Sequence, residues 1–229
     1  MSKRNMIASI TLLTGLALVA IGLLAVAPAL ASGPKHKSTA DVVWTFAEAE
    51  YPNPVGTSTL IRNNNGISAN YTTSDLTPGH TATLWFIVFN NPGACSAPGC
   101  GVDDLGDTPA QGDFLLASGH VIGNDGKATF SGHLKEGDVS GSGLHEVACP
   151  ETKDCGIGLL DAENALVVLA LHSHGPALDG QLLRAQTSSF TGGCDVYLGV
   201  GADNFAGSSA DIPDTPGECS TMQVSPHAP

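Results

Sequence analysis

The stretch Ala165–Gly180, ALVVLALHSHGPALDG, decides the fold, because it holds the longest apolar run of the chain after residue 31. Valine, leucine and alanine fill seven successive positions, and Gly175 and Pro176 then turn the chain. An apolar run of this length that ends at Gly-Pro is typical of a buried strand. The strand raises a functional question, which is whether His172 and His174 bind a metal or only end the strand.

Strand patterns also lie on both sides of this run. The segment TATLWFIVFNN (81–91) is aromatic and β-branched, and it lies between two Pro-Gly pairs. Two hairpins are predicted, at Asn65–Gly66 and at Asn124–Gly126, because Asn and Gly tolerate the positive φ of tight turns. About eight strands with 28 glycines and 14 prolines favour an antiparallel sandwich or barrel. We predict one all-β domain, a disulfide-stabilised antiparallel β-sandwich that is Ig-like or jelly-roll-like.

The N-terminal residues predict export. Lys3 and Arg4 precede an apolar stretch over 7–26, and Ala29-Leu30-Ala31 is a small-x-small site. This pattern predicts a signal peptide over 1–31 that is cleaved after Ala31. An uncleaved anchor is the alternative, since about 20 apolar residues cross a bilayer. The predicted location is secreted or extracytoplasmic, at the cell surface or in the periplasm.

The predicted domain covers residues 41–219. Residues 32–40 and 220–229 are polar, and we predict that both are flexible tails. After signal cleavage no later stretch is long and apolar enough to span a bilayer, so no membrane partner is expected.

The charge excludes one class of partner. The formal net charge is −13 at pH 7, and cleavage after Ala31 would remove two basic residues and no acidic one. Binding to a phosphate backbone depends on lysine and arginine, so nucleic acid is excluded. A strongly negative chain favours cationic partners, including metal ions.

Six cysteines agree with export, because an even count in an exported chain predicts disulfides. Six cysteines permit 15 pairings. We predict nearest-neighbour pairing, since the first two pairs enclose short polar loops and the third fastens the segment before residue 219. Thiolate ligation of zinc is the alternative, which the spacing and an oxidising compartment disfavour. The predicted pairs are Cys95–Cys100, Cys149–Cys155 and Cys194–Cys219.

The order of elements resembles a known family. The segment FAEAEYPNPVGTSTL (46–60), the Asn-Gly hairpin and SDLTPGHTATLWFIVF (74–89) resemble the opening of a CHRD domain, a secreted β module of chordin and of many bacterial proteins of uncharacterised function. The resemblance covers 41–90 loosely, with a second echo at 172–180. It departs at the strand after LTPGH, which carries no His-x-His here. The resemblance implies an exported all-β module and no established chemistry.

His172 and His174 are candidate ligands for zinc or copper. In a strand, residues i and i+2 project from the same face about 6 to 7 Å apart, so both imidazoles could reach one ion. A third ligand would come from a distant histidine or an acidic loop. The alternative is that the two histidines hydrogen-bond to backbone at a strand end. The candidate third histidines are His120, His133 and His145.

Two acidic loops are candidate calcium sites, because calcium takes about six to eight oxygen ligands. Neither loop matches the EF-hand pattern, and ordinary solvation of the carboxylates is the alternative. The first loop holds Asp103, Asp104 and Asp107, and the second holds Asp203, Asn204, Asp211 and Asp214. The candidate cofactors are therefore zinc, copper and calcium.

The predicted function is a binding or cell-surface interaction module whose partner is a protein, a glycan or a metal ion. Loops on a rigid, disulfide-tied scaffold commonly carry ligand contacts. A metal-binding secreted protein and a secreted hydrolase of unidentified type are the alternatives. Catalysis is less favoured, because the chain has no G-x-S-x-G elbow and His145-Glu146 is not followed by x-x-His. Asn70-Tyr71-Thr72 is a glycosylation sequon.

Overall fold

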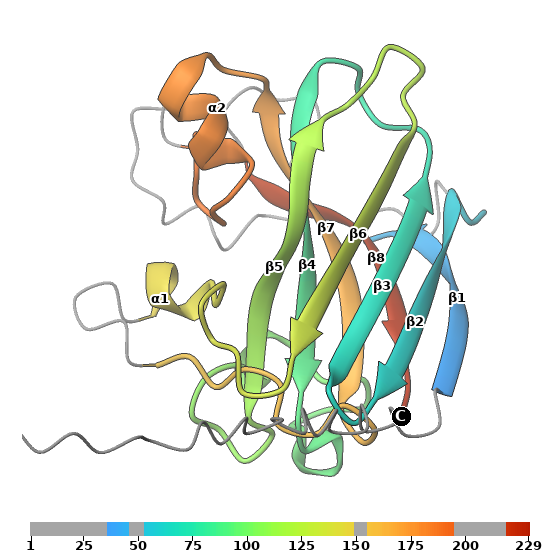
Figure 1. The fold of residues 1–229 in the computed structure, drawn as a ribbon, viewed down its shortest axis with the longest axis vertical. Helices are drawn as coiled ribbons and strands as arrows, with labels where there is room; N and C mark the ends of the chain where they lie inside the picture. The colour runs from blue at the N-terminus through green and yellow to red at the C-terminus, as the bar shows by residue number, and fades with distance from the viewer. Residues whose placement is uncertain (1–35, 46–52, 149–154, 195–218) are drawn as a thin grey trace, which may run out of the picture. The chain divides into compact units, whose positions relative to one another are not determined.

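A computed structural model describes residues 36–45, 53–148, 155–194 and 219–229 (Figure 1). The predicted signal peptide lies outside the described residues. Short helices accompany the strands: η1 (Pro92–Ala94), η2 (Val102–Asp104), α1 (Leu144–Val147) and α2 (Gly180–Gln186). The strands are β1 (His36–Trp44), β2 (Gly56–Asn63), β3 (Gly66–Thr73), β4 (His80–Phe89), β5 (Gly112–Val121), β6 (Ala128–Lys135), β7 (Leu166–Pro176) and β8 (Ser220–His227).

The eight strands form one antiparallel sheet in the order β5-β4-β7-β8-β1-β2-β3-β6. Strand β1 joins the two halves, because its residues 36–42 pair with β2 while Val43 and Trp44 pair with β8. The end strands β5 and β6 also meet, with the ring of His120 stacked on that of Phe130 at 4.2 Å. The predicted all-β antiparallel fold is confirmed, but the sheet is nearly closed and barrel-like rather than plainly a sandwich.

The two predicted hairpins have different outcomes. Strands β2 and β3 pair along their whole length around Asn65–Gly66, as the Asn-Gly signal predicts. Strands β5 and β6 follow each other in the chain without pairing: β5 pairs with β4, and β6 pairs with β3. The connection between them bonds elsewhere, since the backbone of Ile122 pairs with His80 and that of Gly126 accepts from Leu76.

Alternation of side chains along the strands builds the core. Leu84, Phe86 and Val88 of β4 are completely buried, and in β7 Val167, Leu169 and Leu171 are completely buried beside them. A fully buried side chain of this size contributes about 1.5–3 kcal/mol. The apolar run Ala165–Leu171 therefore lies almost entirely in β7, a central strand of the sheet.

The structure differs from the predicted tails at both ends of the domain. Residues 36–40 belong to β1, and residues 220–227 form β8, which lies between β7 and β1. Strand β8 has a polar sequence and is nevertheless part of the sheet, because its buried polar side chains bond to other strands rather than to water. Gln223 accepts from Thr73 at 2.7 Å, and Ser225 lies 2.6 Å from Ser58.

Arg62 anchors the end of β8 from inside the protein. Its side chain is 1% exposed, and its guanidinium donates to the carbonyls of Ala162, Ala165, His227 and Ala228 over 2.8 to 3.1 Å. Burial lowers the pKa of Arg62 from its ordinary value. The residue therefore ties β2, the turn before β7 and the end of β8 to one another.

Two of the three predicted disulfides are present among the described residues, Cys95–Cys100 and Cys194–Cys219. Cys155 is also disulfide-bonded, but Cys149 lies outside the described residues, so that pairing stays a prediction. The disulfides fit an oxidising compartment outside the cytoplasm. Among the described residues, no helix has the length and apolar character needed to cross a membrane.

We predict that Arg62→Ala lowers the free energy of unfolding by about 3 kcal/mol, because it leaves the carbonyls of three buried residues and that of exposed Ala228 without their donor. Arg184→Ala is the control, since Arg184 is exposed and its loss should change stability by less than about 0.5 kcal/mol. Urea denaturation of both variants measures the difference. Equal stability of the two variants would show that Arg62 does not anchor β8.

Candidate functional site

His172 and His174 lie on the outer face of β7. Val167, Leu169 and Leu171 point to the main core, so His172 and His174 point to the opposite face. They are nevertheless buried, at 3% and 0% exposure. A second apolar cluster covers this face, formed by Trp85, Phe114, Leu144 and Phe190.

His174 uses both of its ring nitrogens. Its Nδ1 lies 2.9 Å from the carbonyl of Gly192, which can only accept, so Nδ1 carries the proton. Its Nε2 lies 2.8 Å from Thr83 Oγ1, which also accepts from the indole of Trp85 at 2.7 Å. The Thr83 hydroxyl therefore donates to Nε2, and the imidazole is neutral. Burial lowers the pKa of His174 to about 4, against the opposing hydrogen bond to Gly192.

His172 is less well satisfied. Its ring stacks on that of Phe190 with a centroid distance of 4.1 Å, and its Nδ1 lies 3.4 Å from Thr221 Oγ1. Its Nε2 is buried without a hydrogen-bond partner among the described residues. Burial, followed by the neighbouring His174, lowers the pKa of His172 well below its usual range, while the backbone of Phe190 opposes the shift.

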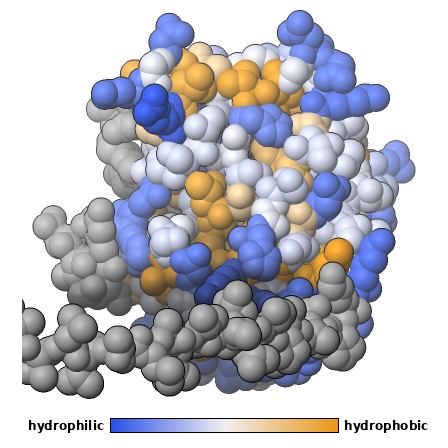
Figure 2. Space-filling model, in the orientation of Figure 1, coloured by the Kyte–Doolittle hydropathy of each residue, from blue (hydrophilic) through white to orange (hydrophobic). Residues whose placement is uncertain are grey.

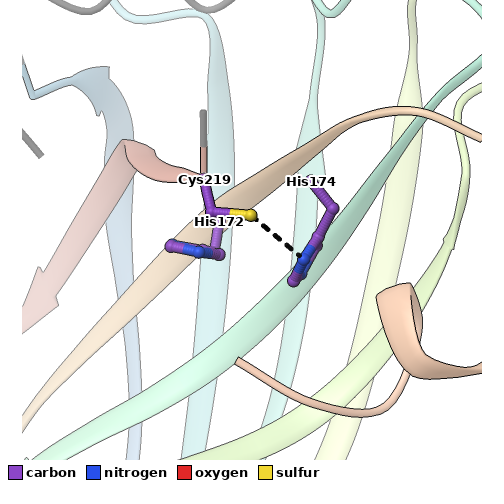
Figure 3. Close-up of side chains that lie close together, drawn as sticks. All are labelled: His172, His174 and Cys219. Carbon is purple, nitrogen blue, oxygen red and sulfur yellow. Dashed lines mark hydrogen bonds between the residues drawn. The ribbon is translucent and has the colours of Figure 1, made fainter. Parts of the chain in front are cut away.

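Cys219 is the third member of this cluster. It directly precedes β8, and its Sγ lies 3.8 Å from Nδ1 of His174. One ligand atom from each of His172, His174 and Cys219 lies within 4.8 Å of the others. Figure 3 shows the Cys219 sulfur directed toward the His174 ring, with the His172 ring beside it. In the structure this sulfur is bonded to the sulfur of Cys194 in a disulfide.

Polar side chains hold residues 190–194, which cover the two histidines and which we call the covering segment. The carboxylate of Glu146 in α1 accepts from the backbone amides of Phe190 and Thr191 over 3.0 to 3.1 Å. Gln186 in α2 donates to the carbonyls of His174 and Pro176 at 3.0 Å each. The covering segment is therefore attached to two helices and to β7 itself. Neither Glu146 nor Gln186 stands in a motif that sequence reasoning recognises.

The other candidate histidines lie outside this cluster. His120 stacks on Phe130, and burial lowers its pKa. His133 is exposed on β6 and bonds to Ser68 at 2.9 Å, while His145 lies in α1. Among the described residues, none of the three joins His172 and His174 in a group of metal-ligating side chains.

The first acidic loop is organised by one of its three aspartates. Asp104 is buried, and its carboxylate accepts from the backbone amides of Ser96 at 2.7 Å and Gly101 at 2.9 Å. These hydrogen bonds, that from Ser96 first, lower the pKa of Asp104. Asp103 and Asp107 are exposed and form no metal-ligating group with Asp104 in the part of the chain that the structure describes. The second acidic loop lies outside the described residues.

One serine–histidine contact has the residue types of hydrolases. His227 lies between two serines, with Nδ1 2.8 Å from Ser38 and Nε2 2.7 Å from Ser58. Ser58 is 1% exposed, so a substrate cannot reach its hydroxyl. Burial, followed by the charge of Arg62, lowers the pKa of His227 to about 4. A general base works best with a pKa near the operating pH, so this contact serves structure.

A polar face covers the half of the sheet formed by β1, β2, β3 and β6. Strand register aligns its outward side chains in rows, and Thr72 bonds to Thr129 across two strands at 3.3 Å. Figure 2 shows pale and blue side chains over much of this side of the molecule. We call the eight residues of two rows the hydroxyl face: Thr39, Thr59, Asn70 and Ser131 in one row, and Asp41, Thr57, Thr72 and Thr129 in the other.

A pocket of about 480 Å³ opens at one end of the hydroxyl face. Thr57 and Thr72 are among the residues that line it, as are Asp41 and Lys127, which carry opposite charges. All four residues are exposed. The sequence indicates threonine-rich strands here, but only the register places these hydroxyls side by side.

Comparison with known proteins gives no relative: no family model, no curated protein and no solved structure matches this chain.

We predict that stability falls as the pH drops from 6.5 to 4. In this window the unfolded chain protonates His174 near pH 6.5, whereas the folded protein keeps it neutral until about pH 4. The unfolded state then binds more protons, and His174 alone removes up to about 3 kcal/mol of stability by pH 4, to which His227 adds because its folded pKa is also about 4. Urea denaturation at several pH values measures this loss.

Two variants identify the group responsible. His174→Gln should show a shallower loss of stability over this pH window, because one titrating group is gone. His133→Ala should keep the full loss, since His133 is exposed. The same pH dependence in His174→Gln as in the parent would exclude His174 as its source.

Proposed function

We propose that this chain is an exported binding module whose ligand is a glycan held on the hydroxyl face. The observation that carries the proposal is the register across four strands, which sets threonine, serine and asparagine side chains in rows beside the pocket. Neighbouring strands are about 4.8 Å apart, and residues i and i+2 are about 6.6–6.8 Å apart. Hydroxyl and amide groups at such spacings can exchange hydrogen bonds with successive sugar hydroxyls.

The pocket supports the same ligand class. A carboxylate such as Asp41 accepts hydrogen bonds from sugar hydroxyls, and Lys127 donates them. The hydroxyl face lies on rigid strands rather than loops, so its groups are held in place before a ligand arrives. The formal net charge of −13 disfavours an acidic polysaccharide and favours a neutral one.

The proposal includes export of the protein from the cytoplasm. The pattern of residues 1–31, the disulfides and the resemblance to CHRD domains each support a protein that works outside the cytoplasm. The proposal also divides the sheet into two sandwich-like halves. Strands β1, β2, β3 and β6 form the binding half, and β5, β4, β7 and β8 form the supporting half.

The experiment is binding of the exported protein to a glycan microarray and to insoluble neutral polysaccharides, cellulose and chitin. We expect binding to at least one of these probes. The double variant Thr57→Val, Thr72→Val should bind that probe at least about tenfold more weakly, because two hydrogen bonds of about 1 kcal/mol each are lost. Valine keeps the branched shape and suits a strand.

The matched control is Ser140→Val, which removes an exposed hydroxyl outside the hydroxyl face and should leave binding unchanged. Failure of every glycan probe to bind would overturn the proposal. Equal binding by the parent and the double threonine variant would overturn it as well, because the ligand would then lie elsewhere.

A further inference from the structure

The cluster of His172, His174 and Cys219 has side chains of the kinds that bind a metal, but the Cys219 sulfur is held in a disulfide. Their ligand atoms lie within 4.8 Å of one another, and Cys219 is bonded to Cys194. Two imidazoles and two sulfurs are the ligands of a structural zinc site. In the disulfide, however, neither sulfur is a thiolate, which is the form that binds metal.

A second observation points to a ligand at this place. Nε2 of His172 is buried and makes no hydrogen bond among the described residues, although the side chain is only 3% exposed. A buried nitrogen without a hydrogen-bond partner destabilises the folded chain. The hydrogen bonds of His174 to the Gly192 carbonyl and to Thr83 Oγ1 fit a neutral imidazole, which is the form of histidine that binds a metal.

We infer that reduction of the Cys194–Cys219 disulfide converts this cluster into a Cys2His2 zinc site formed by Cys194, Cys219, His172 and His174. A dithiol reductant supplies two electrons and two protons, the S–S bond breaks to give two thiols, and the dithiol becomes a disulfide. Zinc then replaces the two thiol protons, which pass to solvent. The inference does not depend on the glycan proposal, because the hydroxyl face lies on other strands.

The surroundings of His174 suit this change. Its Nδ1, which lies 3.8 Å from the Cys219 sulfur, would exchange the Gly192 carbonyl for the metal. The ring proton then moves to Nε2, where Thr83 Oγ1 at 2.8 Å can accept it. A hydrogen bond from the second ring nitrogen is what orients histidines that bind metals. Trp85 holds the Thr83 oxygen in place at 2.7 Å.

Oxidation and zinc binding would therefore exclude each other at these two sulfurs. In an oxidising compartment the disulfide closes the site and joins the residue before β8 to the covering segment. Under reducing conditions zinc would provide the same connection, since its ligands come from β7, from the residue before β8 and from Cys194. The zinc-bound chain would be the form that exists before the disulfide is made.

The experiment is titration of the full chain with zinc against a chromogenic chelator, with and without a phosphine reductant, so that no competing thiol is added. We expect one zinc ion per reduced chain and no tight binding to the oxidised chain. His172→Ala should weaken zinc binding to the reduced chain by at least about tenfold, the lower end of the effect of losing even an outer-shell partner. His133→Ala should leave it unchanged.

The double variant Cys194→Ser, Cys219→Ser keeps the other four cysteines and should lose the zinc site. Reduced chain that binds no zinc, or this variant binding as tightly as the parent, would overturn the inference. Equal effects of His172→Ala and His133→Ala would also overturn it, because an unfolded chain does not distinguish the two histidines.

A second variant works without reductant and so without disturbing the other disulfides. Cys194→Ser leaves Cys219 as a thiol beside His172 and His174, so the oxidised variant should bind zinc while the oxidised parent does not. Cobalt substituted for zinc should give a thiolate charge-transfer band in this variant. No difference in zinc binding between the oxidised variant and the oxidised parent would contradict the inference.

Discussion

The position of the last strand is the constraint on which the rest of the structure depends. Strand β8 lies between β7 and β1, so the sheet is continuous only while β8 is in place. Both ends of β8 are fastened from distant parts of the chain: the Cys194–Cys219 disulfide precedes it, and Arg62 holds the carbonyls of His227 and Ala228 at its end. A covalent link and a buried cation thus secure a strand with few apolar side chains.

The interior around β8 is polar, and its polar groups are largely paired with one another. Gln223 bonds to Thr73, and Ser225 bonds to Ser58. Buried polar groups cost little when their hydrogen bonds are made, and they favour a single register because a slip would leave them unpaired. Hydrogen bonds between buried polar groups therefore fix the register of β8, whereas apolar packing fixes the positions of β4 and β7.

The two proposed sites use opposite halves of the same sheet. The hydroxyl face lies on β1, β2, β3 and β6, and seven of its eight side chains are exposed, with Thr59 half-buried. The histidines lie on β7, where α2 and the Phe190 segment cover the outward side. The same alternation along strands gives an accessible polar surface in one half and a buried cluster in the other.

The sequence by itself determined the features that depend on neighbours in the chain. Patterns within ten residues or so predict β7, β4 and the Asn65–Gly66 hairpin, since turn chemistry and strand periodicity are local. Only the tertiary structure decided that β8 is a strand, that β5 and β6 do not pair, and that Cys219 lies beside His174, 45 residues away in the chain. Those features depend on which distant groups meet, and no local pattern encodes the partner of a buried polar side chain.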